Sequence, residues 1–106
     1  DCMALAGTDL AEMHLGGRLI RRERGRLTLA DGTLAGADLT LPQAVATLTR
    51  IGIAPARALA MATRIPADVV GRPDLGRLVA GGPADFVALG PDGALCGVWR
   101  GGVALG

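Results

Sequence analysis

The chain has 106 residues and a formal net charge of +1, which predicts one small domain or a piece of a larger one. Half of the residues are hydrophobic, but they include one Phe, one Trp and no Tyr. Because small aliphatic side chains bury little area each, the mean hydropathy of +0.40 indicates surface that something else covers. The nearly neutral charge favours no class of partner.

Several classes of protein are disfavoured at once. The sequence has no run of 18 apolar residues and no signal-peptide pattern, so we expect neither a membrane span nor secretion. Cys2 and Cys96 are too few for a disulfide framework and lack metal-ligand spacing, so we expect free thiols in a reducing cytoplasm. The first residue is Asp1 rather than an initiator Met, which suggests processing or a fragment.

The first third of the chain favours loop and β-structure. Residues 1–13 show no clean period, and we expect a loop with a helical turn near 10–13. Two short strands are predicted at 18–22 and 26–29, joined through Arg24-Gly25 as a hairpin. The side chains expected on its packed face are Leu19, Leu27 and Leu29.

A loop is expected from Asp31 to Gln43, where the period changes. Asp31-Gly32 is a turn dipeptide, and Gly36 leaves the main chain bare for a ligand or a second backbone to approach. Thr40 has the character of a helix N-cap, with Gln43 completing a capping box. A loop of this kind, ending at a helix N-terminus, can bind polar or anionic ligands.

Helices and then strands follow. Helical spacing predicts helices over 41–51, from Pro55 to about 63, and over 67–70. The remaining strand predictions are 76–79, 86–89, 95–100 and 103–105. The apolar run 86–89 suits a strand covered on both faces. The predicted fold class is therefore α+β: a β-hairpin, two to three helices and a β-meander.

The chemistry-bearing side chains do not form a complete catalytic apparatus. His14 is the single histidine, so no histidine cluster can bind a metal. A cap or turn role explains Asp31 and Asp38. A cluster of arginines interrupted by Glu23 is typical of a solvated hairpin rather than a nucleic-acid site, since aromatic stacking partners are absent. The cluster comprises Arg18, Arg21, Arg22, Arg24 and Arg26.

Several segments resemble the N-acetylglucosamine-6-phosphate deacetylases of the amidohydrolase superfamily. The discriminating segment is Asp31-Gly-Thr-Leu-Ala-Gly-Ala-Asp-Leu-Thr40 before an amphipathic helix. Residues 1–7 resemble the family's Asp-Ala-Met-Ala-Ala-Ala-Gly run, and 61–67 its Met-Ala-Thr-x-x-Pro-Ala helix pair. Leu15-Gly-Gly17 resembles the start of an inserted β-ribbon. The tail around Ala84-Asp85-Phe-Val87 is similar to many amidohydrolases and is less specific.

The resemblance implies roles for four residues. Asp1 would be the catalytic Asp, acting as general base on a metal-bound water and then as acid to the leaving amine. Leu34, Ala35 and Gly36 would contact the amino-sugar substrate. A divalent metal, zinc or iron, is expected in the parent protein, with no metal ligand in this chain, so the chain alone should be inactive.

The resemblance also implies a parent (β/α)8 barrel with a flanking β-sandwich. Residues 1–14 would end barrel strand 8 and begin the following loop, 15–32 would form the β-hairpin, 33–71 the substrate loop and barrel-side helices, and 72–106 part of the sandwich. The chain would then be the C-terminal part of a cytoplasmic, homo-oligomeric deacetylase. Its partners would be an amino-sugar phosphate and the rest of the parent chain or another copy, with neither nucleic acid nor membrane.

Two alternatives remain open from the sequence. One is a different amidohydrolase, of the dihydroorotase or deaminase type. The other is a non-catalytic module whose open sheet edges pair with another chain.

Overall fold

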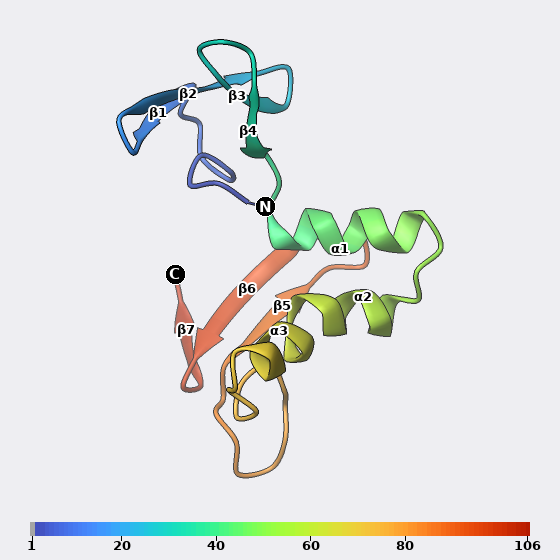
Figure 1. Cartoon of the computed structure of the whole chain (residues 1–106). Coiled ribbons are helices and arrows are strands. Elements are labelled where there is room, and N and C mark those ends of the chain that lie inside the picture. The colour runs from blue at the N-terminus through green and yellow to red at the C-terminus, as the bar shows by residue number, and fades with distance from the viewer. Residues whose placement is uncertain (1) are drawn as a thin grey trace. The chain divides into compact units, whose positions relative to one another are not determined.

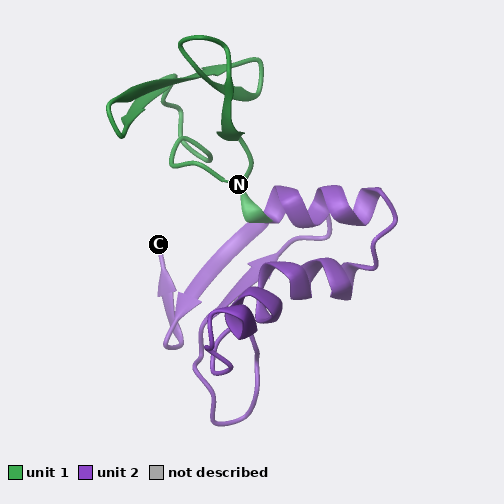
Figure 2. Ribbon diagram, viewed as in Figure 1, with its two compact units in different colours: residues 1–41 green, residues 42–106 purple. Residues whose placement is uncertain are grey.

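The computed structural model describes residues 2–106 and confirms an α+β chain with two separate sheets (Figure 1). The chain divides after Leu41 into two compact units, called unit 1 and unit 2 below (Figure 2). Unit 1 holds one sheet, and unit 2 holds the helices and the other sheet. No helix in the described range is long and apolar enough to cross a membrane.

Unit 1 is built around a four-stranded antiparallel sheet in the order β1-β2-β3-β4. Its strands are β1 (Glu12–Leu15), β2 (Arg18–Glu23), β3 (Arg26–Leu29) and β4 (Leu34–Ala37). Two tight hairpins need positive φ at both central residues, which Gly16-Gly17 and Arg24-Gly25 supply. The hairpin predicted around Arg24-Gly25 is therefore confirmed.

The core of unit 1 consists of Leu5, Ile20 and Leu27, which are at most 2% exposed. In the β2–β3 register Ile20 lies opposite Leu29, and Arg22 lies opposite Leu27. These four side chains therefore share one face, because alternate residues of a strand point to the same side. The prediction that Leu19 lies on the packed face was wrong, since Ile20 takes that place.

Two loop predictions in unit 1 were also wrong. Glu12–Leu15 form β1, so the N-terminal loop ends earlier than expected. Within the predicted loop 31–43, Leu34–Ala37 form β4 and pair with β3. Gly and Ala are poor strand formers, and here the pairing partner overrides local propensity.

The helices of unit 2 lie close to their predicted positions. They are α1 (Leu41–Arg50), α2 (Pro55–Ala62) and α3 (Arg64–Val69). After α1, Gly52 has φ +98°, its N–H bonds Thr49 O, and Ile53 N–H bonds Leu48 O at 3.0 Å. This pair of bonds is a Schellman motif, in which a left-handed glycine satisfies the last carbonyls of a helix.

The second sheet is a meander of β5 (Phe86–Leu89), β6 (Leu95–Arg100) and β7 (Val103–Leu105), as predicted. Phe86 and Trp99 face each other across β5 and β6, with their rings stacked 4.9 Å apart. Two predictions failed here. The segment 76–79 is not a strand. Val87 is 52% exposed within this chain, so β5 is not covered on both faces.

Candidate functional site

The three residues expected to contact substrate lie on β4, the last strand of the first sheet (Figure 1). Gly36 lies opposite Leu27 and Leu34 opposite Thr28, so the register shifts and Ala35 is left without a directly opposite residue. Such a bulge bends a strand and re-aims its side chains. Ala35 packs against the core, whereas Leu34 is 60% exposed.

The outer edge of β4 is joined by the beginning of the chain. Cys2 forms a parallel bridge with Ala37, and its thiol donates a hydrogen bond to the carbonyl of Leu39. Asp1, the expected general base, lies outside the described residues, but it directly precedes Cys2 in the sequence. The structure thus places the residue that follows Asp1 beside the strand that carries Leu34, Ala35 and Gly36.

Arg22 links the N-terminal loop, residues 3–11, to the end of β4. Its Nη1 donates to the carbonyls of Thr8 and Leu10 at 2.7 and 2.9 Å, and its Nη2 donates to the carbonyl of Leu5. Nη2 also lies 3.0 Å from Asp38 Oδ1. We call this group of contacts the Arg22 clamp.

The ion pair within the clamp is largely withdrawn from solvent. Arg22 Nε lies 2.7 Å from Asp38 Oδ2, although its N–H does not point along a hydrogen bond, and the two side chains are 21% and 15% exposed. Ion pairs withdrawn from water are screened less by salt than surface pairs. The prediction that a cap or turn role explains Asp38 was therefore wrong, and Arg22 is not part of a solvated hairpin face.

The turn before β4 is fixed by Asp31, as its Asp-Gly dipeptide predicted. Asp31 Oδ1 accepts a hydrogen bond of 2.9 Å from the backbone N–H of Thr33. This bond, together with a side-chain bond from Thr33, lowers the pKa of the Asp31 carboxyl, because both stabilise the charged form. Asp31 thus shapes the chain as it enters β4.

Two hollows reach β4. One of about 410 Å³ is bounded by Leu34, Gly36 and Asp38 among others, and one of about 520 Å³ by Leu34, Ala35 and Met3 among others. Leu34 borders both hollows. Charged side chains stand beside apolar ones at both, with Arg18 at the larger hollow and Arg26 at the smaller.

A metal centre is not formed by the residues 2–106. No group of three or more His, Cys, Asp and Glu side chains gathers among them. The single histidine, His14, is exposed on β1 and belongs to no such group among the described residues. The described residues therefore do not by themselves form a site for a metal ion.

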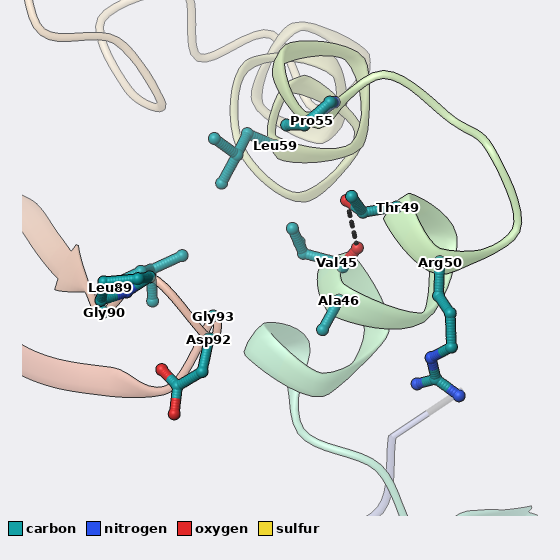
Figure 3. A pocket seen from close by; sticks show the side chains of 11 residues that line it. Val45, Ala46, Thr49, Arg50, Pro55, Leu59, Leu89, Gly90, Asp92 and Gly93 are labelled. Carbon is teal, nitrogen blue, oxygen red and sulfur yellow. Dashed lines mark hydrogen bonds between the residues drawn. The ribbon is translucent and has the colours of Figure 1, made fainter.

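Unit 2 contains a separate cleft of about 440 Å³ between α1, α2 and the turn that follows β5 (Figure 3). Val45, Leu59 and Leu89 point into it, and the Arg50 guanidinium and the Asp92 carboxylate point away (Figure 3). The Thr49 hydroxyl donates a hydrogen bond of 3.0 Å to the Val45 carbonyl. The cleft therefore presents apolar surface and no group suited to acid–base chemistry.

Comparison with known proteins decides the family. The amidohydrolase family model matches residues 7–105. The chain belongs to the amidohydrolase family. Among curated relatives, N-acetylgalactosamine-6-phosphate deacetylase of Shewanella sp. (strain ANA-3) is 35% identical over 106 residues, which is 99% of this amidohydrolase chain and 27% of the relative.

Solved structures give the same picture. N-acetylglucosamine-6-phosphate deacetylase from Pasteurella multocida matches with a TM-score of 0.90 and 27% identity, over 99% of this chain and 28% of that one. The enzyme of the same name from Thermotoga maritima matches with a TM-score of 0.83 and 28% identity, over 98% of this chain and 29% of that one. A mutant N-acetyl-D-glucosamine-6-phosphate deacetylase from Mycobacterium smegmatis, in complex with N-acetyl-D-glucosamine-6-phosphate, matches with a TM-score of 0.79 and 31% identity. This match covers 96% of this chain and 28% of that one.

The resemblance noted in the sequence is thus confirmed, with one qualification of scale. This amidohydrolase chain spans little more than a quarter of the length of the relatives it matches. Amidohydrolases are generally metal-dependent, and this chain contributes no ligand cluster within its described range.

Sequence reasoning missed the Arg22 clamp. Its one signal was that Arg22 alternates in step with Ile20 on the packed face.

Proposed function

We propose that this chain is the C-terminal part of a longer amidohydrolase that deacetylates N-acetylglucosamine-6-phosphate, giving glucosamine-6-phosphate and acetate. The observation that carries the proposal is the Cys2–Ala37 bridge, which brings the segment following Asp1 alongside β4. That pairing unites two segments to which the resemblance assigns the general base and the sugar contacts. The names of the relatives, all hexosamine-phosphate deacetylases, support the same reaction.

In this proposal each site residue has one task. Asp1 accepts a proton from the attacking water and returns it to the departing amine, which is the work of a general base and then a general acid. Leu34, Ala35 and Gly36 position the amino sugar, with the bulge at Ala35 setting which groups of β4 face it. The 106 residues alone are inactive, because the rest of the site is supplied by the remainder of the protein.

The longer protein is proposed to be a (β/α)8 barrel with a flanking β-sandwich, in which residues 1–14 end barrel strand 8 and 72–106 belong to the sandwich. Residues 15–32 would be an inserted hairpin, and 33–71 the substrate segment with barrel-side helices. A divalent metal, zinc or iron, would be held by ligands outside this chain. The enzyme would work in the cytoplasm as a homo-oligomer.

A second substrate is favoured by one specific observation. The curated relative at 35% identity is an N-acetylgalactosamine-6-phosphate deacetylase. The two hexosamine phosphates differ only in the configuration at C4, so the reacting acetamide is the same. The second candidate is therefore the same reaction on the galactosamine epimer.

The test is acetate release by the full-length protein that contains this chain, with both sugar phosphates as substrates. We expect release from at least one, and a loss of about 10²-fold or more in kcat for Asp1→Asn, since an amide cannot accept the proton. Asp9→Asn is the matched control, because Asp9 is an exposed carboxylate of the same N-terminal segment. Undiminished turnover by Asp1→Asn would refute the role of Asp1, and no acetate from either sugar would refute the proposed reaction.

A further inference from the structure

The Arg22 clamp joins three parts of unit 1 that are distant in sequence. The guanidinium comes from β2, it binds carbonyls of residues 5, 8 and 10 in the N-terminal loop, and it pairs with Asp38 directly after β4. The backbone N–H of Arg22 adds a bond of 2.8 Å to the Ala11 carbonyl. One residue therefore fixes the loop to the sheet at four carbonyls.

The two segments held by the clamp are the ones on which the proposed chemistry depends. The N-terminal loop directly follows Asp1 and Cys2. Asp38 comes two to four residues after Leu34, Ala35 and Gly36. We infer that Arg22 is a positioning residue, which sets the segment carrying the general base against the strand that faces the sugar. This inference rests on the proposed function.

The chemistry of the clamp calls for arginine. A guanidinium has five N–H donors in a rigid plane, so it can bind several carbonyls and a carboxylate at once. The ammonium of lysine is a compact group with three donors and cannot span the same acceptors. Asp38 balances the charge, and both side chains are mostly withdrawn from solvent, so the arrangement is held in one geometry.

A neighbouring arginine provides a matched control. Arg21 lies on the same strand but on the opposite face, 3.6 Å from Glu12, and both side chains are more than half exposed. Exposed pairs of this kind contribute little to stability. Removing Arg21 changes charge by the same amount as removing Arg22 without touching the clamp.

The experiment uses the full-length protein and measures kcat and KM for acetate release by Arg22→Lys, Arg22→Ala, Asp38→Asn and Arg21→Ala. We expect kcat to fall about 10- to 100-fold for both Arg22 variants, because a misplacement of about 1 Å is enough for such a loss. Asp38→Asn should fall less, since an amide oxygen still accepts a hydrogen bond. Arg21→Ala should stay within about twofold of wild type, and added guanidinium should restore part of the activity of Arg22→Ala.

The outcomes separate the two proposals. If folded Arg22→Ala and Arg22→Lys keep wild-type kcat, Arg22 does not position the site. If Arg22→Ala fails to fold, folded Arg22→Lys decides by the same measurement. If wild type releases no acetate from either sugar, the proposed function fails instead. Hydrogen exchange over residues 3–10 then tests the clamp, and exchange no faster in Arg22→Lys than in wild type would overturn it.

Discussion

The two units of the chain reach order by different means. Unit 1 closes a small core of Leu5, Ile20 and Leu27 and adds a shielded ion pair that ties its loop down. In unit 2 the buried side chains within the described range are Ala58 and Ala67. Because an alanine buries only one methyl group, these two side chains gain far less from the hydrophobic effect than the three core side chains of unit 1.

Unit 2 instead relies on local devices. Schellman motifs end both α1 and α3, where Gly71 N–H bonds Asp68 O and Arg72 N–H bonds Ala67 O at 2.8 Å. Asp68 also holds Arg77 through two bonds of 2.7 and 2.8 Å. Large apolar side chains meanwhile lie open, Val69 at 81% exposed among them. The contrast teaches that regular helices and strands do not require a sealed interior in the same segment of chain.

The largest expected effect tests the core of unit 1. Leu27→Ala should lower the free energy of unfolding by about 2–5 kcal/mol, because it removes a fully buried side chain and leaves a cavity. In this 106-residue chain Leu95→Ala, at a site 51% exposed in unit 2, should change it by about 0.5 kcal/mol or less. Urea unfolding followed by circular dichroism measures both, and equal losses would break the contrast between the units.

A backbone contact in unit 2 gives the next effect. Gly76 has φ +68°, and a Cβ there would lie 2.6 Å from the carbonyl carbon of Thr63. Gly76→Ala should therefore cost the left-handed penalty of about 1–2 kcal/mol and a further amount for moving the backbone. Gly81→Ala is the control, because Gly81 has φ +79° with open space around it. Similar thermal stabilities for the two variants would contradict the close approach.

A smaller effect concerns the meander. Asp85 Oδ1 accepts a bond of 2.7 Å from Gly101 N–H, and Gly102 N–H bonds Ala84 O at 2.9 Å, so the family-like Ala84-Asp85 pair holds the β6–β7 turn. Asp85→Ala should cost about 1 kcal/mol, as loss of one hydrogen bond at an exposed site does. Asp85→Asn keeps the acceptor and should cost less. Amide exchange at Gly101 reports the difference, and identical exchange in both variants would exclude this role.

The smallest effect returns to unit 1. The bonds from Thr33 lower the pKa of Asp31, so the carboxylate stabilises the turn at pH values above its unfolded pKa. That stability is lost as the pH falls through the lowered, folded pKa. Asp31→Asn removes the titration, so the difference between wild type and variant should shrink in acid. A difference in melting temperature that stays constant down to pH 2 would contradict it.

Sequence reasoning located most elements because turns and helix ends are encoded locally. Gly52 and the Arg24-Gly25 pair mark boundaries by themselves. The face of β2 could not be chosen locally, since Leu19 and Ile20 are both apolar and the pairing with β3 decides between them. The segment 76–79 has strand character but gains no partner within the described chain.

The candidate site was less accessible to prediction for the same reason. Leu34, Ala35 and Gly36 came from a resemblance, and their place on a bulged strand depends on β3. Arg22 could not be singled out among five arginines, because its partners lie 12 to 17 residues away in sequence. Contacts of that range are fixed by the folded register.

The stacked pair in the meander has a practical consequence. Trp99 is the single tryptophan of the sequence, it lies in unit 2, and there is no tyrosine. Its ring covers Gly97, where an added Cβ would lie 2.6 Å from a ring atom. Intrinsic fluorescence therefore observes the meander and is blind to unit 1, so a circular dichroism change without an emission shift would assign a melting event to unit 1.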